Sequence, residues 1–276
     1  MAKTKKNVLM TGTSGYLGKF LASHLQHEIN VIPLLNDRGL PWRLGDALDS
    51  DQLRDADALL HAAWDMNIEN WDEIIPINIR GSRVLVKQAK THAVPVVFIS
   101  SMSAFTGCRS KYGRAKLIVE KTVVNNGGKI IRPGLVWSQG ELGGILGKIA
   151  KLVNWLPIIA IPSTDTQKLH MTNLSNLGDI ILDMIQGNLD INCHPVFAEL
   201  EPITLKTIVK TVARKKNKPS LVFAVHPKFF ICALTMVNRL LGSKKIKIDS
   251  LVGLLHAVEK PEFCGTFPEL RFLQDF

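Results

Sequence analysis

Apolar residues along the first two thirds of the chain alternate between short continuous runs and longer segments with helical spacing. The short runs are apolar at nearly every position, which is typical of parallel strands covered on both faces. Strands are expected at Asn7 to Met10, Asn30 to Leu35, Ala58 to His61, Val96 to Ser100 and Lys129 to Ile131. Helices are expected at Gly15 to Gln26, Ile77 to Thr91 and Lys111 to Val124. This alternation predicts an α/β fold in which helices flank a parallel sheet.

After Gly134 the alternation becomes less regular. The pattern predicts a strand and a helix within Leu169 to Ile185, a helix at Thr204 to Arg214 and another at Lys228 to Leu241 after Pro227. Leu142 to Ile161 is long enough to cross a membrane, but its lysines, glycines and proline exclude a span. The apolar part of the last helix, from Phe229, is too short to span and is expected in the core, with peripheral membrane attachment through adjacent basic residues as the alternative.

Three glycines follow the first predicted strand at intervals of three, in the segment Thr11 to Gly18. Gly12, Gly15 and Gly18 would permit a tight turn and let the backbone approach a pyrophosphate, whose charge the amino end of the next helix can meet. A glycine-rich turn alone is weak evidence. Here a strand precedes it, a helix follows it, and a second strand ends about twenty residues later, as the mechanism requires. The segment predicts a dinucleotide-binding loop.

A second group of reactive side chains follows the fourth predicted strand. Ser101 and Ser103 lie just after its end, and Tyr112 and Lys116 are one helical turn apart on the next helix. An ammonium near a phenol favours its ionised form, so we expect Lys116 to lower the pKa of Tyr112 and make it a base. A strand-end serine can hydrogen-bond the oxygen of an alcohol or carbonyl substrate. We assign the catalytic roles to Ser101, Tyr112 and Lys116, with Ser103 as the alternative serine.

Taken together, these motifs make the chain resemble an extended short-chain dehydrogenase/reductase, in the family of NAD-dependent epimerases and dehydratases that act on nucleotide sugars. Further matches are Gly45-Asp46, His61-Ala62-Ala63, Asn78 with Gly81 and Leu85, Arg132-Pro133-Gly134, Asp249 to Leu254 and Leu270 to Phe272. The resemblance implies a Rossmann-type doubly wound parallel sheet with a smaller C-terminal substrate domain. The expected domains are residues 1–136 plus about 166–188 for NAD(P), and about 137–165 plus 189–276 for the substrate.

The resemblance also implies which residues hold the cofactor, NAD or NADP. They are Gly12, Thr13, Ser14, Gly15, Tyr16, Leu17, Gly18, Arg38, Asp46, Ala47, Ala62, Ala63, Asn78, Tyr112, Lys116 and Pro133. In the family an acidic residue often ends the second strand. Here Asp37 comes late and Arg38 is close by, which favours a 2′-phosphate and hence NADP over NAD.

Composition narrows the remaining possibilities. Hydrophobic residues make up 46% of the 276 residues and charged residues 21%, which excludes a disordered or fibrous chain. The net charge is +10, and the excess lies between Ile203 and Lys260, which indicates an anionic partner or a solvated basic surface. The four cysteines have no zinc-ligand spacing, so no metal site is expected. These cysteines, and the absence of a secretory signal at the N-terminus, predict a cytoplasmic protein.

The expected reaction is NAD(P)-dependent oxidation, reduction or epimerisation at a hydroxyl or keto group of a nucleotide-diphosphate sugar. Dehydration is disfavoured because Met102 and Ser103 stand where family dehydratases carry an Asp-Glu pair. A steroid or other alcohol dehydrogenase is a second alternative, and a non-catalytic dinucleotide sensor or scaffold is a third. The basic segment has no nucleic-acid-reading motif, so no nucleic-acid partner is expected. A homodimer is an expectation from the resemblance alone. Trp64, Trp71, Trp137 and His170 are weaker cleft candidates, each more typical of structural positions.

Overall fold

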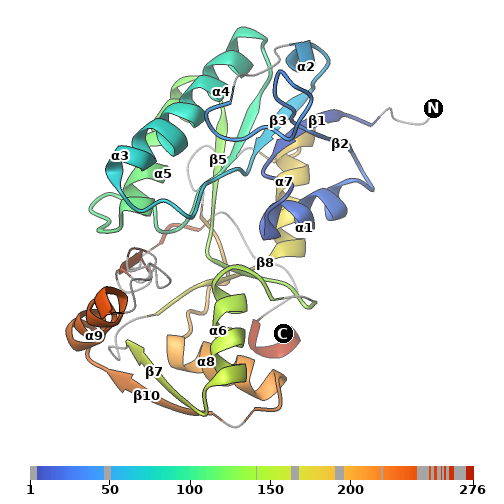
Figure 1. Cartoon of the computed structure of the whole chain (residues 1–276). Helices are drawn as coiled ribbons and strands as arrows, with labels where there is room; N and C mark the ends of the chain where they lie inside the picture. The colour runs from blue at the N-terminus through green and yellow to red at the C-terminus, as the bar shows by residue number, and fades with distance from the viewer. Residues whose placement is uncertain are drawn as a thin grey trace.

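The computed structural model has two lobes, a larger one built on a parallel sheet and a smaller one that carries the C-terminus (Figure 1). It describes residues 5–46, 51–140, 142–162, 168–189, 196–218 and 220–240, and near the C-terminus residues 249, 252, 253, 256, 258, 261–263 and 272–276. Of the expected site residues, Ala47 lies outside these ranges. Parts of the two C-terminal motifs, at residues 250, 251, 254, 270 and 271, also lie outside them.

The larger lobe contains a six-stranded sheet whose neighbouring strands all run parallel. Its strand order is β2-β1-β3-β4-β5-β9. The chain leaves β1 for β2 on one side and then crosses to β3 on the other, which creates the switch point where such sheets bind ligands. The predicted parallel α/β fold of Rossmann type is therefore confirmed. The strands are β1 (Asn7–Thr11), β2 (Asn30–Pro33), β3 (Ala58–His61), β4 (Val96–Ile99), β5 (Lys129–Pro133) and β9 (Val196–Phe197).

Helices cover both faces of the sheet because successive strand residues point to opposite sides. Leu9, Leu59 and Phe98 pack with α4 (Gly81–Thr91) and α5 (Lys111–Asn125) on one face. Val8, Met10, Leu60 and Val97 pack with α1 (Tyr16–Leu25) and α7 (Leu174–Gln186) on the other. These strand residues are buried, which explains the unbroken apolar runs in the sequence.

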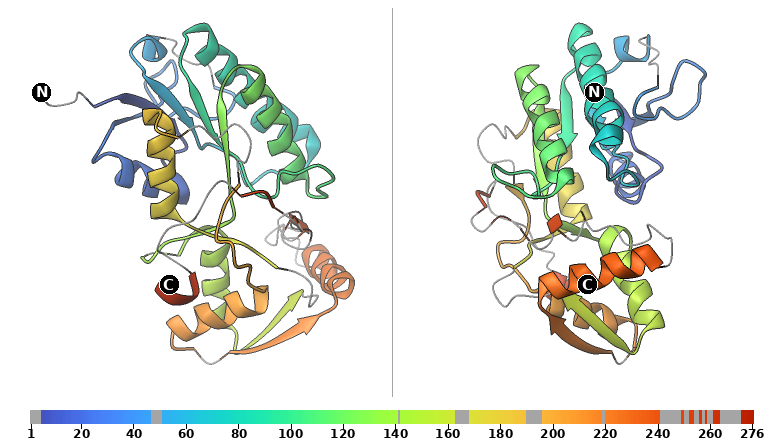
Figure 2. Two further views of the ribbon diagram at one scale, coloured as in Figure 1. Left: turned by 180° about the vertical axis from the view of Figure 1, so that it is seen from behind. Right: turned by 60° about the vertical axis from the view of Figure 1, so that its left-hand side comes forward.

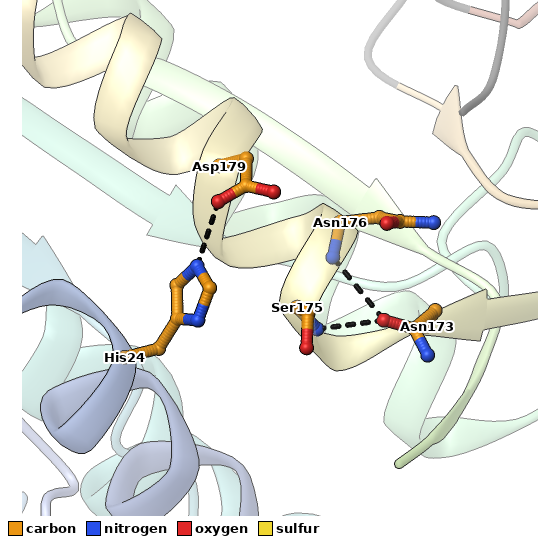
Figure 3. A network of polar contacts seen from close by, with 5 residues as sticks. All are labelled: His24, Asn173, Ser175, Asn176 and Asp179. Carbon is orange, nitrogen blue, oxygen red and sulfur yellow. Dashed lines mark hydrogen bonds and ion pairs between the residues drawn. The ribbon is translucent and has the colours of Figure 1, made fainter. Parts of the chain in front are cut away.

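Helices α1 and α7 lie against each other although they are far apart in the sequence (Figures 1 and 2). Gly178 allows this approach, since a Cβ there would lie 2.4 Å from the His24 ring. His24 Nε2 also contacts Asp179 Oδ1 at 2.7 Å (Figure 3). Asn173 caps α7, because its Oδ1 accepts hydrogen bonds from the backbone N–H groups of Ser175 and Asn176, at 2.8 and 3.2 Å. The returning chain thereby closes one face of the sheet.

Several element boundaries differ from the predicted ones. The helix expected from Ile77 begins earlier, with α3 (Trp71–Ile74) and the π-helix η1 (Ile75–Arg80) before α4. Pro76 has no N–H to donate to the preceding turn, which accounts for a change of helical register there. Strand β2 ends at Pro33, before the expected Leu35, and a short helix α2 (Asp51–Arg54) was not predicted.

The smaller lobe has its own apolar core, in which Trp137, Met171, Ile208 and Phe272 are fully buried. Strands β6 and β8 form one pair, and β7 and β10 form another. Within the described ranges, no helix combines the length and apolar character needed to cross a membrane. The elements of this lobe are β6 (Leu135–Trp137), α6 (Gly144–Trp155), β7 (Ile158–Pro162), β8 (Met171–Asn173), α8 (Leu205–Lys215), β10 (Leu221–Val225), α9 (Pro227–Leu240) and α11 (Phe272–Asp275).

The loop between β1 and α1 folds closely on itself and on β3. Gly12 has φ +75°, and a Cβ there would lie 2.8 Å from the backbone nitrogen of Ala63. A Cβ on Gly18 would lie 2.0 Å from the Gly12 carbonyl oxygen, whereas one on Gly15 would lie 3.5 Å from it. Gly12 and Gly18 are therefore required for the packing of the loop itself, whereas Gly15 is not.

Replacing Gly18 with Ala should separate α1 from the loop, because the added methyl group overlaps the Gly12 carbonyl. We expect a loss of about 2 kcal/mol in the free energy of unfolding, measured by urea denaturation. Gly15→Ala is the matched control, since its methyl group meets the same oxygen at an ordinary contact distance. Equal stabilities of the two variants would show that the loop does not pack this way.

Candidate active site

A cleft of about 830 Å³ opens at the carboxyl ends of the central strands. Its lining includes the β1–α1 loop, the ends of β3 and β4, the first turns of α5 and the β5–β6 connection. From the smaller lobe and the C-terminal segment it receives Gly144, His170, Asp249, Gly253 and Val258. The volume lies within the range usual for ligand sites.

A buried polar network joins β1 to β3 below the glycine loop. Thr11 Oγ1 accepts hydrogen bonds from the backbone N–H groups of Ala62 and Ala63, at 3.1 and 3.0 Å, so its own proton is directed to His61 Nδ1 at 2.8 Å. His61 Nε2 then donates to Ser82 Oγ at 2.9 Å. Burial, and next the charge of Lys116, lower the pKa of His61 to about 3. The ring is therefore neutral and fixes the strand end that lines the cleft.

Lys116 is almost completely buried, and its ammonium is held by a carbonyl and two aromatic rings. Nζ donates to the Ile99 carbonyl oxygen at 2.7 Å and lies 4.1 Å from the ring centroid of Trp64 and 4.5 Å from that of Phe98. Burial lowers the pKa of Lys116 to about 7, although the carboxylate of Glu120 acts in the opposite direction.

Tyr112 lies one helical turn before Lys116 and contacts the same tryptophan, edge to face, at 5.9 Å between ring centroids. Burial raises the pKa of Tyr112 to about 12, and a hydrogen bond with Ser101 opposes this rise. The sequence-based expectation that Lys116 lowers this pKa below its ordinary value is thus not met in the structure. Desolvation of the phenolate outweighs the nearby ammonium, whose Nζ lies 5.9 Å from the phenol ring centroid.

The serine loop after β4 packs directly on α5. A Cβ on Gly113 would lie 2.1 Å from the Ser103 carbonyl oxygen, so only glycine allows this contact. Ser101 Oγ accepts from the Ser103 backbone N–H at 3.2 Å, and the Met102 N–H donates to the Pro133 carbonyl at 3.0 Å. Both candidate serines and Met102 line the cleft, and Ser101 is the one hydrogen-bonded to Tyr112.

The first turn of α5 is capped by a carboxylate from the far end of the chain. Asp249 accepts hydrogen bonds from the backbone N–H groups of Lys111 at 2.7 Å and Tyr112 at 2.9 Å. The Ser110 hydroxyl accepts the next N–H, that of Gly113, at 3.1 Å. Negative charge at the amino end of a helix is favourable, so Asp249 stabilises the turn that carries Tyr112.

The cleft brings together most of the residues expected from the sequence. The expected residues that line the cleft are Gly12, Ser14, Gly15, Tyr16, Leu17, Gly18, Ala62, Ala63, Ser101, Tyr112, Lys116 and Pro133. Thr13, Arg38, Asp46 and Asn78 are not among its lining residues. Arg38 is exposed in the turn after β2, and the Asp46 carboxylate accepts from the Arg43 N–H at 2.9 Å.

Asn78 is buried in η1, and its amide is bonded to the backbone of the β3 loop. Its Oδ1 accepts from the Asp65 N–H at 2.9 Å, and its Nδ2 donates to the Asp65 carbonyl at 3.0 Å. Both functions of the amide thus hold the segment that follows Ala63 and Trp64. The structure places Asn78 as a residue that positions the cleft wall.

The sequence indicates two residues of the site only weakly, Trp64 as a lesser cleft candidate and Asp249 as the first residue of a C-terminal motif. Trp64 contacts both Lys116 and Tyr112, but a tryptophan after a strand is more typical of ordinary packing. Asp249 lies 137 residues from Tyr112, and the sequence pattern indicates no capping of so distant a helix. Of the other candidates, His170 lines the cleft, whereas Trp137 is buried in the smaller lobe and Trp71 packs in the larger core.

The amino end of α1 suits a phosphate group. Its cap residue, Gly15, carries no side chain that could satisfy the first N–H groups, and the first turn contains no acidic residue. Gly12, Gly15 and Gly18 leave the backbone accessible from the cleft. The residues present therefore fit a dinucleotide pyrophosphate at this loop.

Comparison with known families agrees with this geometry. Residues 8–130 match the model of the NAD dependent epimerase/dehydratase family, which confirms the resemblance drawn from the motifs. The match covers β1 through the start of β5 and includes the glycine loop and all three catalytic candidates. This part of the chain is thus similar to a family described as NAD-dependent. No curated protein has detectable sequence similarity to the chain.

Solved structures share the fold at low sequence identity. The dTDP-4-dehydrorhamnose reductase of Bacillus anthracis, in complex with NADP, has a TM-score of 0.66 and 19% identity over 82% of this chain and 86% of its own. MoeE5, in complex with UDP-glucuronic acid and NAD, has a TM-score of 0.63 and 18% identity over 80% and 85%. The NAD-dependent NDP-hexosamine 5,6-dehydratase TunA has a TM-score of 0.64 and 16% identity over 91% and 96%.

Replacing Lys116 with Met should stabilise the fold at low pH. The pKa of Lys116 falls from 10.5 to about 7 on folding, so the folded chain binds fewer protons between these values and stability rises with pH across that interval. The energetic penalty of the buried charge is therefore fully present below pH 7. We expect Lys116→Met to raise the free energy of unfolding by about 1 to 3 kcal/mol at pH 6, with the gain shrinking toward pH 10. A variant less stable than the parent at pH 6 would contradict this account.

Replacing Asp249 with Ala should loosen the start of α5, because two N–H groups lose their acceptor. We expect a loss of about 1 to 2 kcal/mol in urea denaturation. Ser110→Ala, which removes the single acceptor of the neighbouring N–H, is the matched control and should cost about 1 kcal/mol. If Asp249→Ala were as stable as the parent chain while Ser110→Ala were destabilised, capping of α5 by Asp249 would be ruled out.

Proposed function

Since residues 8–130 match the NAD dependent epimerase/dehydratase family, we propose that the chain is an NAD(P)-dependent oxidoreductase or epimerase acting on a nucleotide-diphosphate sugar. Its reaction would be hydride transfer at a keto or hydroxyl group of the sugar. Relatives in the fold that were solved with NADP, or with UDP-glucuronic acid and NAD, support this class of cofactor and substrate.

The observation that carries the proposal is the convergence of three side chains beside a phosphate-binding loop. Ser101 at the end of β4 and Tyr112 and Lys116 on α5 line the same cleft as Gly12, Gly15 and Gly18. The cleft lies at the carboxyl edge of the sheet, where open α/β folds bind their ligands. A scaffold without chemistry would not require a buried ammonium next to a buried phenol.

Each side chain has a role that follows from its surroundings. Tyr112 exchanges a proton with the substrate oxygen, and Ser101, already bonded to the phenol, donates a hydrogen bond to that oxygen. Lys116 faces the same cleft and supplies positive charge beside the phenol. A bound nicotinamide would supply or accept the hydride. Trp64 keeps water away from Tyr112 and Lys116.

The protonation state of Tyr112 favours reduction of a keto group. With a pKa near 12 the phenol is protonated at neutral pH and is ready to donate its proton to a developing alkoxide. Oxidation would require the phenolate, which burial disfavours. We therefore place the reductive direction first, with epimerisation through the same proton and hydride transfers as the second function.

The choice between NAD and NADP is carried by Arg38. Its position after β2 suits a 2′-phosphate, although the side chain is exposed and lies outside the lining of the cleft. We propose NADP as the preferred cofactor on this basis. A cytoplasmic location and pairing of two chains through the cofactor lobe are proposals that rest on the sequence alone.

Tyr112→Phe should lower kcat by at least about a hundredfold with a keto-sugar nucleotide and NADPH, because no other phenol faces the substrate oxygen in the proposed site. The variant should still bind cofactor: at 100 times Kd, NADP should stabilise it by about 2.7 kcal/mol, as it does the parent chain. Thr91→Val removes a hydroxyl outside the cleft lining, which donates to the Lys87 carbonyl oxygen at 3.1 Å, and should leave kcat within about threefold. Retained turnover in Tyr112→Phe would remove the tyrosine from the mechanism, and equal stabilisation by NAD would remove the role of Arg38.

A further inference from the structure

Helix α9 exposes the side chains that a helix ordinarily turns toward a protein core. Phe229, Cys232, Ala233 and Met236 follow the spacing i, i+3, i+4 and i+7, which places them along one stripe. All four are exposed, and the side chain of Phe229 is 73% accessible. None of the side chains described between residues 227 and 236 is buried. Among the residues that the structure describes, this apolar helix is incompletely partnered.

The strand pair next to α9 is apolar on its outer face as well. In the parallel register Leu221 lies beside Ile158 and Phe223 beside Ala160, so these four residues share one face. Leu221 is 71% accessible, and Ile158 and Phe223 are exposed too. The alternate residues of both strands pack into the core of the smaller lobe. Figures 1 and 2 show α9 at the periphery of that lobe, following directly on β10 and lying close to β7.

The end of α6, directly before β7 in the sequence, exposes two further large apolar side chains. Trp155 is 84% accessible, and the next residue, Leu156, is exposed directly before β7. Several large apolar side chains exposed on adjoining elements are unusual for a monomeric protein and mark an interaction site. Tryptophan and phenylalanine are also residues that settle well at the boundary between water and lipid.

The charged side chains that the structure describes between residues 202 and 240 are all basic. Lys216 and Lys218 are exposed in the turn before β10, and Lys228 is exposed after it. The sequence contains no acidic residue between Glu201 and Asp249. The chain as a whole carries a net charge of +10. A second copy of the chain would bring an equally basic segment to the interface, which is electrostatically unfavourable. An anionic lipid surface has the opposite charge.

We propose that the apolar surface of α9, β7 and β10 docks onto an anionic membrane surface. Phe229, Met236 and Trp155 would enter the headgroup region while the flanking lysines contact acidic headgroups. The attachment is peripheral, since it uses one face of a 14-residue helix and one face of a two-stranded sheet. This property is independent of the proposed catalytic function and places the cleft near a membrane without altering its chemistry.

The test is flotation of the purified full chain with vesicles of phosphatidylcholine alone and of phosphatidylcholine mixed with phosphatidylglycerol. The parent chain should float with the mixed vesicles and remain unbound with the neutral ones, and added salt should weaken binding. The double variant Phe229→Gln, Met236→Gln should bind the mixed vesicles at least about tenfold more weakly because it loses two inserting side chains. Replacing Lys216, Lys218 and Lys228 with Gln should weaken binding to a similar degree and reduce its salt dependence.

Two control variants separate this surface from general effects of hydrophobicity and charge. Leu273→Gln removes an exposed apolar side chain from α11, and Lys87, Lys90 and Lys121→Gln removes three exposed lysines from the other lobe. Both should float like the parent chain, and all variants should keep the thermal stability of the parent. Absence of binding to the mixed vesicles, or equal binding by the surface and control variants, would overturn the proposal. A parent dimer that Phe229→Gln, Met236→Gln converts to a monomer, without vesicle binding, would assign the surface to a second copy instead.

Discussion

The buried ammonium of Lys116 is the group around which the site is organised. A charge removed from water needs compensating partners, and here they come from separate elements: the Ile99 carbonyl at the end of β4 and the rings of Trp64 and Phe98. The opposite charge nearest along the helix is Glu120, which Arg132 of β5 holds through a hydrogen bond of 2.8 Å. One cation therefore fixes the relative positions of α5, β4 and the β3 loop. The phenol of Tyr112 lies one helical turn before Lys116 and contacts the same Trp64 ring, so the same packing positions it.

The neutrality of His61 follows first from its burial and then from that cation. An imidazolium near Lys116 would place two positive charges in a space with little water, and both burial and Lys116 lower the pKa of the ring. Both ring nitrogens of the neutral His61 make ordinary hydrogen bonds. Nδ1 accepts from Thr11, and Nε2 donates to Ser82. Thr11 in turn holds the backbone of Ala62 and Ala63 at the wall of the cleft. Because His61 is neutral, Lys116 is the single cation in the group formed by Lys116, His61, Thr11 and Ser82.

Features that depend on neighbouring residues could be predicted from the sequence, and features that depend on distant segments could not. The strands from Asn7 to His61 and the Tyr112–Lys116 pair are local patterns of burial and helical spacing, so their positions were predicted closely. The π-helical register at Pro76, the pairing of β7 with β10 and the capping by Asp249 arise from tertiary contacts. The raised pKa of Tyr112 belongs to the same class, because the helical spacing indicates the neighbouring ammonium but gives no measure of burial. Asn78 lies between these two classes. The sequence motif locates the residue, but only the structure shows that its amide bonds to both the backbone N–H and the backbone carbonyl of Asp65.

Asp249 links the C-terminal segment to the catalytic helix in a way that has a consequence for specificity. The carboxylate is bonded to the backbone of Tyr112 itself and also lines the cleft, together with Gly253 and Val258 from the same segment. A substrate that displaced this segment would pull on the first turn of α5, whereas one that fitted under it would leave the cap and the phenol in place. In the proposed function, the position of Tyr112 would then depend on how well the substrate fits beside Asp249. Substrate selection and the placement of Tyr112 would both depend on the two hydrogen bonds that Asp249 accepts.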